Sequence, residues 1–258
     1  VAHATGRSAK DVICVCRRMG GAFGGKESQA ATIACMSAIM AVKTGRACKL
    51  RLDRDLDMIM TGKRHDFVID YDVGFDASGR ILGIDFMFAS RCGISADLSG
   101  PVNDRTMFHC DNAYFLENVH ILSHRCKTNT VSNTAFRGFG GPQGMYAIEY
   151  VIDDIARTLD IDPLEVRRRN FYGIGERDVT QYHQKIDDNI INEIVDKLEA
   201  DANYSARRQA ISEFNASSKV LKRGIALTPV KIGISFTATH LNQAGALVHV
   251  YKDGSVHL

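Results

Sequence analysis

The sequence is organised around the glycine-rich stretch Thr134-Ala135-Phe136-Arg137-Gly138-Phe139-Gly140-Gly141-Pro142-Gln143-Gly144. Glycine permits a positive φ and a close approach of backbone to ligand, and a proline at the first helical position loses no needed N–H group. Downstream, apolar residues recur with helical period on one face: Met145, Ile148, Ile152, Ile155, Ala156 and Leu159. The pattern predicts a glycine turn at a helix N-terminus, where exposed backbone N–H groups suit an anion or a polar cofactor.

A second turn of the same form lies upstream, in Gly20-Gly21-Ala22-Phe23-Gly24-Gly25-Lys26-Glu27. Two such turns, each with a phenylalanine and a charged residue, predict two walls of one pocket. The pattern leaves open the alternative of two ordinary loop-to-helix turns with core phenylalanines. Lys26 is followed by Glu27 and not by Ser or Thr, which argues against a nucleotide triphosphatase loop, and the glycine spacing does not match a dinucleotide fold.

The composition is that of an ordinary globular protein, with 258 residues, 45% hydrophobic and 24% charged. The net charge of +2 and the lack of an aromatic-interleaved basic stripe argue against a nucleic-acid partner. The longest apolar run, 30–42, is too short to span a bilayer, so no membrane partner is expected. Seven cysteines without Cys-x-x-Cys spacing argue against a metal or iron–sulfur site made from them.

The periodicity predicts an α/β (mixed α+β), non-Rossmann fold. We expect strands at 11–17, 49–53, 67–75, 80–90, 118–127, 234–238 and 246–251, and helices at 28–43, 145–159, 163–169, 190–198 and 204–214. The helix at 28–43 is apolar nearly all round and is expected to be buried. The chain starts at Val1 and stops within a predicted hairpin, so we expect a fragment truncated at both ends, with subdomains at 1–218 and 219–258.

The local sequence pattern alone identifies few candidate catalytic or binding residues. Arg137 lies inside a glycine turn, where a long cation indicates an anion to hold. Glu27 is also explained as a carboxylate near a helix N-terminus. Arg105 has no local signal, and Phe139 and Phe236 are explained equally by core packing.

Both glycine turns resemble those of the molybdenum hydroxylase family, which contains the xanthine dehydrogenases and aldehyde oxidases. The resemblance extends through all 258 residues. More narrowly, the chain resembles the animal xanthine dehydrogenases and, among these, the insect enzymes. It rests on the two turns and on the motifs Leu52-Asp53-Arg54-Asp55, Thr61-Gly62-Lys63-Arg64-His65, Phe108-His109-Cys110-Asp111-Asn112 and Asn242-Gln243-Ala244-Gly245-Ala246-Leu247. It implies part of a molybdenum-cofactor-binding domain.

The resemblance also implies a site. The cofactor would be molybdenum–molybdopterin, held without a side-chain ligand to the metal, with the backbone of Phe23, Gly24 and Arg137 facing it. The substrate-binding residues would be Glu27, Arg105, Phe139, Phe236, Thr237, Leu98 and Leu241, with Glu27 and Arg105 also acting in catalysis. The two phenylalanines would hold a flat purine, the acid would bond its ring, and the arginine would stabilise developing negative charge. Ala238, where relatives often carry valine, would widen the pocket slightly.

The implied parent enzyme oxidises hypoxanthine to xanthine and xanthine to urate, with water as oxygen source and NAD as acceptor. FAD and two 2Fe–2S clusters would lie outside this fragment, which is expected to be inactive alone. The parent would be a homodimer of the cytoplasm or peroxisome. Aldehyde oxidases usually lack the acid and the arginine, so Glu27 and Arg105 favour purines. Aldehyde oxidase remains the nearest alternative, and a non-catalytic anion-binding or scaffolding module is the alternative of another class.

Overall fold

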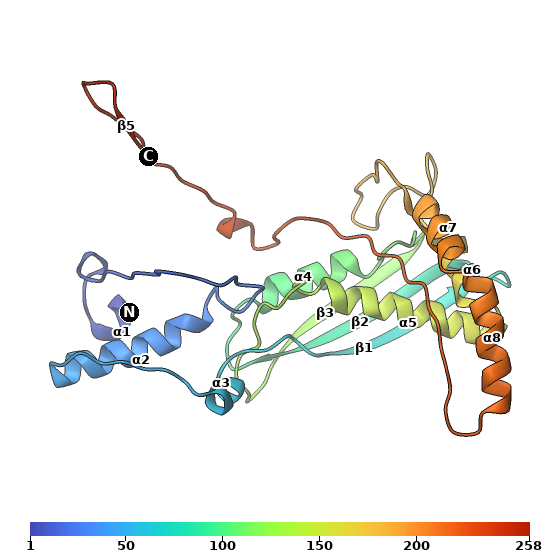
Figure 1. Ribbon diagram of the computed structural model, residues 1–258, viewed down its shortest axis with the longest axis horizontal. Coiled ribbons are helices and arrows are strands. Elements are labelled where there is room, and N and C mark those ends of the chain that lie inside the picture. The colour runs from blue at the N-terminus through green and yellow to red at the C-terminus, as the bar shows by residue number, and fades with distance from the viewer.

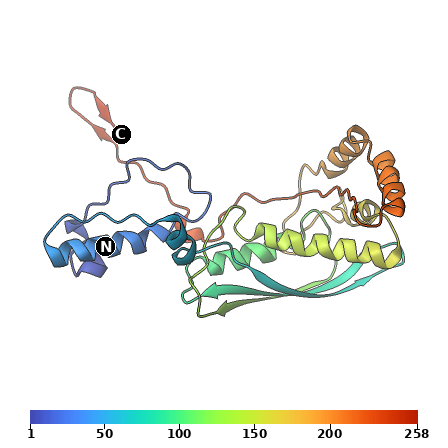
Figure 2. The same cartoon turned by 60° about the horizontal axis from the view of Figure 1, so that its bottom comes forward.

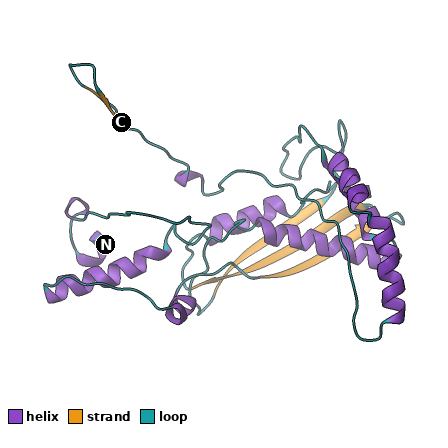
Figure 3. Ribbon diagram, viewed as in Figure 1, coloured by secondary structure: helices purple, strands orange, loops and turns teal.

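The computed structural model describes residues 1–258, and a three-stranded sheet crossed by two helices forms its folded centre (Figure 2). The chain contains both helices and strands in a mixed α/β fold, as predicted (Figure 3). The elements are α1 (Ala2–Thr5), η1 (Ala9–Asp11), α2 (Gln29–Thr44), α3 (Arg54–Met60), β1 (Phe67–Phe75), β2 (Ile81–Gly93), α4 (Ser99–His109), β3 (Val119–Lys127), α5 (Gly141–Leu159), α6 (Pro163–Asn170), α7 (Ile191–Asp201), α8 (Tyr204–Ser217), η2 (Thr239–Leu241), β4 (His249–Val250) and β5 (Val256–His257).

The sheet has the order β1-β2-β3 and mixes two kinds of pairing. The strands predicted at 67–75 and 80–90 form β1 and β2, which pair antiparallel as a hairpin. Its turn is closed by Asp76, whose Oδ1 accepts hydrogen bonds from the backbone N of Ser78 at 2.8 Å and of Arg80 at 3.1 Å. β3 pairs parallel with β2, so the intervening chain must cross over, and α4 makes that crossover.

The core lies between the sheet and the inner face of α5. Ile148, Ile152 and Ile155 of that helix are fully buried against a cluster that includes Phe86 and Phe88 of β2. Each such side chain contributes about 1.5–3 kcal/mol by leaving water. The apolar face predicted for 145–159 is therefore confirmed, and the helix begins earlier, at Gly141, with Pro142 in its first turn.

The helices that follow agree with the sequence pattern. Asp162 caps α6, because its Oδ1 accepts a hydrogen bond from the backbone N of Leu164 at 2.8 Å. The helices predicted at 163–169, 190–198 and 204–214 correspond to α6, α7 and α8. None of the helices combines the length and hydropathy that a membrane crossing requires.

Several expectations for the two ends of the chain were wrong. Residues 11–17, 49–53 and 234–238 form no strand, because a strand needs a neighbouring strand to pair with and none pairs with them. Of the strand expected at 246–251, only β4 forms, paired antiparallel with β5 around the predicted Asp-Gly turn. Arg54 begins a short helix, α3, that the sequence pattern did not predict; the Asp53 carboxylate caps it by accepting from Leu56 N at 2.9 Å.

The helix predicted at 28–43 forms as α2, but the expectation that it is buried was wrong. No residue of α2 is buried, and Met36, Met40 and Val42 are exposed. The element that α2 packs against is α1, and both lie at the end of the molecule away from the sheet (Figure 1). The apolar composition predicted the helix correctly, but it does not show whether another element packs against that helix and buries it.

Candidate functional site

The two glycine turns are in direct contact. Gly24 has φ +74° and packs on the second turn so closely that an added Cβ would lie 2.7 Å from backbone atoms of Ala135 and Phe136. Phe23 and Phe139 occupy equivalent places in the two Phe-Gly-Gly motifs, and both adopt positive φ, at 49° and 50°. Non-glycine residues reach this region only when the surroundings hold them there. The tertiary structure therefore joins two turns that are more than a hundred residues apart in sequence into one backbone surface.

A third segment, residues 61–65, supports the second turn from behind. Thr134 donates its backbone N–H to the Lys63 carbonyl at 3.0 Å, and Arg64 Nη2 donates to the Arg137 carbonyl at 2.6 Å. The Arg64 guanidinium also lies over the Phe136 ring, 4.6 Å from its centroid. These contacts order the backbone of the turn, and the sequence reasoning assigned Arg64 no role in them.

Helix α4 brings four of the expected substrate residues together. Arg105 is buried on α4 and donates to the carbonyls of Gly233 and Ser235. The Phe139 ring lies 5.1 Å from the Phe236 ring, with an angle of 52° between their planes. Thr237 Oγ1 donates to the Pro101 carbonyl at the start of α4, at 2.8 Å. The groove beside them measures about 600 Å³ and is lined by Arg105, Ile232, Gly233, Ile234, Ser235, Phe236 and Asn242.

Glu27 is not joined to this cluster. Its exposed carboxylate accepts hydrogen bonds from the backbone N of Gly25 at 2.8 Å and of Lys26 at 3.0 Å, and it forms no ion pair with Arg105. Its chain neighbours do reach the site region, because Gly24 contacts the second turn and Ser28 Oγ donates to Asp97 Oδ1 at 2.5 Å.

The remaining expected residues lie at the margins. Leu98 is partly buried at the N-cap of α4, next to Asp97, and Leu241 is about half exposed in η2. The side chain of Arg137 is exposed, so its backbone carbonyl and not its guanidinium is engaged. Ala238, directly after Thr237, is buried.

Unpartnered polar atoms gather around the second turn. They are the buried atoms Arg64 Nη1, Arg105 Nε, Thr134 Oγ1 and Gln143 Oε1. Unpaired buried polar groups cost free energy, so these donors and acceptors favour a polar ligand. Together with the backbone surface of the two glycine turns, they fit a polar, anionic cofactor such as molybdenum–molybdopterin.

Sequence reasoning missed His109, which lies one helical turn after Arg105. The Gly233 backbone N–H donates to His109 Nε2 at 3.0 Å, and His109 Nδ1 lies 3.1 Å from the Arg105 carbonyl. Burial and the neighbouring Arg105 charge lower the pKa of His109 to about 4, so its ring is neutral near pH 7. The i, i+4 spacing of the two residues was a signal, although it does not reveal the distant partner.

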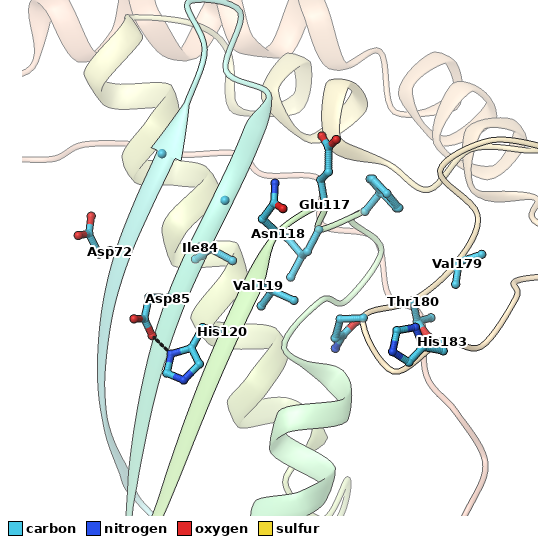
Figure 4. Close-up of a pocket in the computed structure, with 15 residues that line it drawn as sticks. Asp72, Ile84, Asp85, Glu117, Asn118, Val119, His120, Val179, Thr180 and His183 are labelled. Atoms are coloured by element: carbon cyan, nitrogen blue, oxygen red, sulfur yellow. Dashed lines mark hydrogen bonds and ion pairs between the residues drawn. The ribbon is translucent and has the colours of Figure 1, made fainter.

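A larger surface depression lies elsewhere, beside the N-terminal ends of β2 and β3, and measures about 1010 Å³ (Figure 4). Its walls include Asp85, paired with His120 at 2.9 Å, and residues 179–183 of a neighbouring loop. No residue expected in the site lines this cavity. Size alone therefore does not locate the chemistry, and the contact between the two glycine turns is the better guide.

Comparison with known proteins places the chain in a family. Residues 1–171 and 197–258 each match a family model described as a molybdopterin cofactor-binding domain. The chain is 46% identical over 258 residues to the xanthine dehydrogenase of Calliphora vicina, in an alignment that covers 100% of this chain and 19% of that protein. It is 47% identical over 244 residues to the nicotinate hydroxylase of Emericella nidulans, covering 94% of this chain and 18% of that one. The solved aldehyde oxidoreductase of Desulfovibrio gigas superposes with a TM-score of 0.66 and 29% identity over 78% of this chain and 21% of that chain.

The chain therefore belongs to the molybdopterin cofactor-binding domain family. The resemblance to molybdenum hydroxylases and the mixed α/β fold predicted from the sequence are both confirmed. The chain spans about a fifth of the length of the curated relatives it matches (19% for the Calliphora vicina protein). The boundary expected at residue 218 stays a prediction.

Proposed function

We propose that this chain forms the part of a xanthine dehydrogenase that holds the molybdenum–molybdopterin cofactor beside a purine site. The whole enzyme oxidises hypoxanthine to xanthine and xanthine to urate, taking oxygen from water. The observation that carries the proposal is the cluster of Arg105, Phe139 and Phe236 directly beside the paired glycine turns. The 46% identity to the Calliphora vicina xanthine dehydrogenase supports it.

The cofactor is held by backbone more than by side chains in this proposal. The turns at Phe23-Gly24 and at Arg137 present main-chain groups, while Arg64 Nη1 and Gln143 Oε1 are free to bind its polar atoms. When bound, the cofactor supplies the two-electron oxidation. The chain's own residues orient the purine and balance its charge.

The substrate residues have distinct roles. Phe139 and Phe236 are tilted relative to each other, so one ring can stack on a flat heterocycle while the other contacts its edge. Arg105 is largely buried, and the effective dielectric constant around it is lower than in water. A cation therefore stabilises an anionic purine more strongly there than it would in water. Glu27 would accept hydrogen bonds from the purine N–H groups once its carboxylate leaves the backbone N–H groups of Gly25 and Lys26 that it binds in this structure. Thr237, Leu98 and Leu241 complete the walls and the entrance.

In the whole enzyme, FAD and two 2Fe–2S clusters outside residues 1–258 pass electrons to NAD. We infer that this enzyme is a homodimer of the cytoplasm or peroxisome and that residues 1–258 alone are inactive. A second candidate is a hydroxylase of another aromatic nitrogen heterocycle, which the 47% identity to a nicotinate hydroxylase favours. An aldehyde oxidase is the third candidate, since an aldehyde does not require an acid and an arginine, such as Glu27 and Arg105, at opposite edges of the substrate.

The test is made in the full-length protein that carries this chain, expressed in a host that makes the cofactor. We expect Glu27→Ala and Arg105→Met each to lower kcat/KM for hypoxanthine and xanthine by at least about 100-fold, or ~3 kcal/mol, as expected for the loss of a charged transition-state contact. Arg157→Met and Glu213→Ala remove exposed charges on α5 and α8 and serve as matched controls. Urate formation, aldehyde oxidation, nicotinate hydroxylation and bound molybdenum are measured for every variant.

The outcomes separate the candidates. Loss of purine oxidation with aldehyde oxidation retained in Arg105→Met supports the purine assignment. Unchanged purine kinetics in both site variants would refute the substrate roles, and wild-type preference for nicotinate or aldehydes would favour the corresponding alternative. Absence of molybdenum from the wild-type protein would favour a non-catalytic module.

A further inference from the structure

Residues 229–237, which we call the strap, run extended along α4 and the turn that follows it (Figure 1). The strap is separated from α4 by more than a hundred residues, yet hydrogen bonds fix it at five points. Its partners on the α4 side are Pro101, Arg105, His109, Asp111 and Asn112. The first three are spaced by four residues, so they form a single stripe along the helix.

Every fixed residue of the strap has an odd number. The Pro229 carbonyl accepts from Asn112 Nδ2 at 2.9 Å, and Lys231 N donates to Asn112 Oδ1 at 3.1 Å. Gly233 bonds through both its N–H and its carbonyl, to His109 and Arg105. In an extended chain the N–H and C=O of alternate residues point to the same side. Side chains of the helix therefore take the place of a neighbouring strand.

The even-numbered residues in the middle of the strap, 230, 232 and 234, are turned to solvent. Val230 and Ile232 are more than half exposed, and Ile234 is fully exposed. Apolar burial therefore does not hold the middle of the strap, and its position depends on the polar contacts. Gly233 is the central fixed point, because His109 and Arg105 bind its two backbone groups.

The strap ends in the proposed substrate site. Phe236 and Thr237 directly follow the Ser235 carbonyl that Arg105 binds, and Phe236 contacts Phe139. A shift of the strap by one fixed point would move both residues relative to the glycine turns. The contacts at Gly233 lie three residues before Phe236, on the same extended segment.

We propose that His109 is a positioning residue that fastens the strap to α4 through Gly233 and so sets the place of Phe236 and Thr237 against Phe139. The substrate consequence rests on the proposed function, whereas the fastening itself does not. His109 acts as a neutral acceptor: its Nδ1–H is directed to the Arg105 carbonyl, which leaves Nε2 free to accept from Gly233 N–H.

Protonation of His109 would remove this acceptor. The charged groups around the ring are Arg105 on its own helix and Lys231 of the strap, both cationic and both lowering its pKa. Asp111 faces Lys231 and Tyr172, whose hydroxyl donates to its carboxylate at 2.7 Å, and not the imidazole. In an imidazolium, Nε2–H would face the Gly233 N–H, so two donors would oppose each other. The positive ring would also lie near the cations Arg105 and Lys231. The fastened state is therefore weakened as pH falls below about 6.5, the ordinary pKa of histidine.

The direct test is hydrogen exchange of the strap in the full-length protein, measured by mass spectrometry on peptides spanning 229–237. His109→Phe keeps an aromatic ring but has no acceptor, and we expect Gly233 N–H to exchange about tenfold faster. His109→Gln keeps an acceptor of similar reach without a titrating group, and we expect it to restore most of the protection. His120→Phe, at an exposed histidine on the sheet, is the matched control and should leave the strap unchanged.

A second measurement needs no substitution. In the wild type, exchange rates are normalised to an unstructured reference peptide. The strap amides should become less protected between pH 6.5 and pH 5, while those on the buried side of α5 keep their protection. His109→Gln should show no such loss. This comparison decides the question even if His109→Phe lowers the protection of the whole protein.

The outcomes distinguish this inference from the proposed function. Unchanged strap exchange in a folded His109→Phe, or equal pH dependence in wild type and His109→Gln, would overturn the fastening whatever the enzyme oxidises. A strap that responds in a protein without purine activity would uphold the fastening and refute the substrate assignment. With purine activity present, we expect His109→Phe to raise KM for xanthine more than it lowers kcat, with molybdenum content unchanged and KM recovered in His109→Gln.

Discussion

The contact between the two glycine turns makes Gly24→Ala the sharpest test of the site. At φ +74° an alanine is strained by about 1–2 kcal/mol, because its Cβ crowds the backbone. That Cβ would also lie 2.7 Å from three backbone atoms of Ala135 and Phe136. Backbone atoms cannot move aside as the end of a flexible side chain can. Overpacking of this kind costs about 1–3 kcal/mol more, so we expect a total of about 2–5 kcal/mol or a separation of the turns.

A matched control isolates the contribution of the contact. Gly175 has φ +81°, and an added Cβ there would have no atom within 4 Å, so Gly175→Ala carries the backbone strain alone. Urea denaturation of both variants gives the two free energies of unfolding, and metal analysis of the full-length protein gives the bound molybdenum. We expect Gly24→Ala to be the less stable of the two by about 1–3 kcal/mol and to lose bound molybdenum, which Gly175→Ala retains. If the two variants match in both stability and metal content, the turns do not form one surface and the argument for the site fails.

Two further predictions concern buried charge. Arg167 is almost fully buried and bonds Glu149 at 2.7 Å and Asp153 at 3.0 Å, so Arg167→Met leaves a largely buried carboxylate without its cation and should cost about 3–5 kcal/mol in urea unfolding. Arg208→Met, which breaks the partly exposed pair with Asp162, should cost less than about 1 kcal/mol, and equal losses would contradict the difference in burial. For pH, the pKa of His109 is lowered to about 4, so the unfolded chain binds a proton more readily and stability falls as pH drops from about 6.5 toward 4. Burial raises the pKa of Asp111, which acts in the opposite direction, so the measurement is the difference in the free energy of unfolding between wild type and His109→Gln; a difference independent of pH would refute it.

Local patterns predicted the centre of the fold well. Strands β1 and β2 followed from the strand patterns at 67–75 and 80–90, and α5 followed from the period of Ile148, Ile152 and Ile155. The helix predicted at 163–169 forms as α6, and Asp162 caps it through a short-range hydrogen bond to the backbone N of Leu164. In each case the residues that decide the structure lie within a few positions of one another.

The same patterns failed where a distant partner was needed. The alternation in 11–17 and 234–238 resembles a strand, but no neighbouring strand pairs with either segment. The apolar α2 was expected to be buried, yet it packs on α1 and leaves its methionines exposed. Alternation and composition describe which surface a segment would bury and not whether another segment arrives to cover it.

The sequence by itself determined the glycine turns, the helices that follow them and, through its motifs, the family to which the chain belongs. Only the tertiary structure decided that Gly24 rests on Ala135 and Phe136, that Arg105 binds the strap, and that Glu27 stays apart from it. The physical reason is the range of the interactions. Turns and helices follow from steric limits and hydrogen bonds between near neighbours. The partners of Arg105 and His109 lie more than a hundred residues away, are mostly backbone atoms of an extended segment, and carry no residue-specific signal that a sequence could reveal.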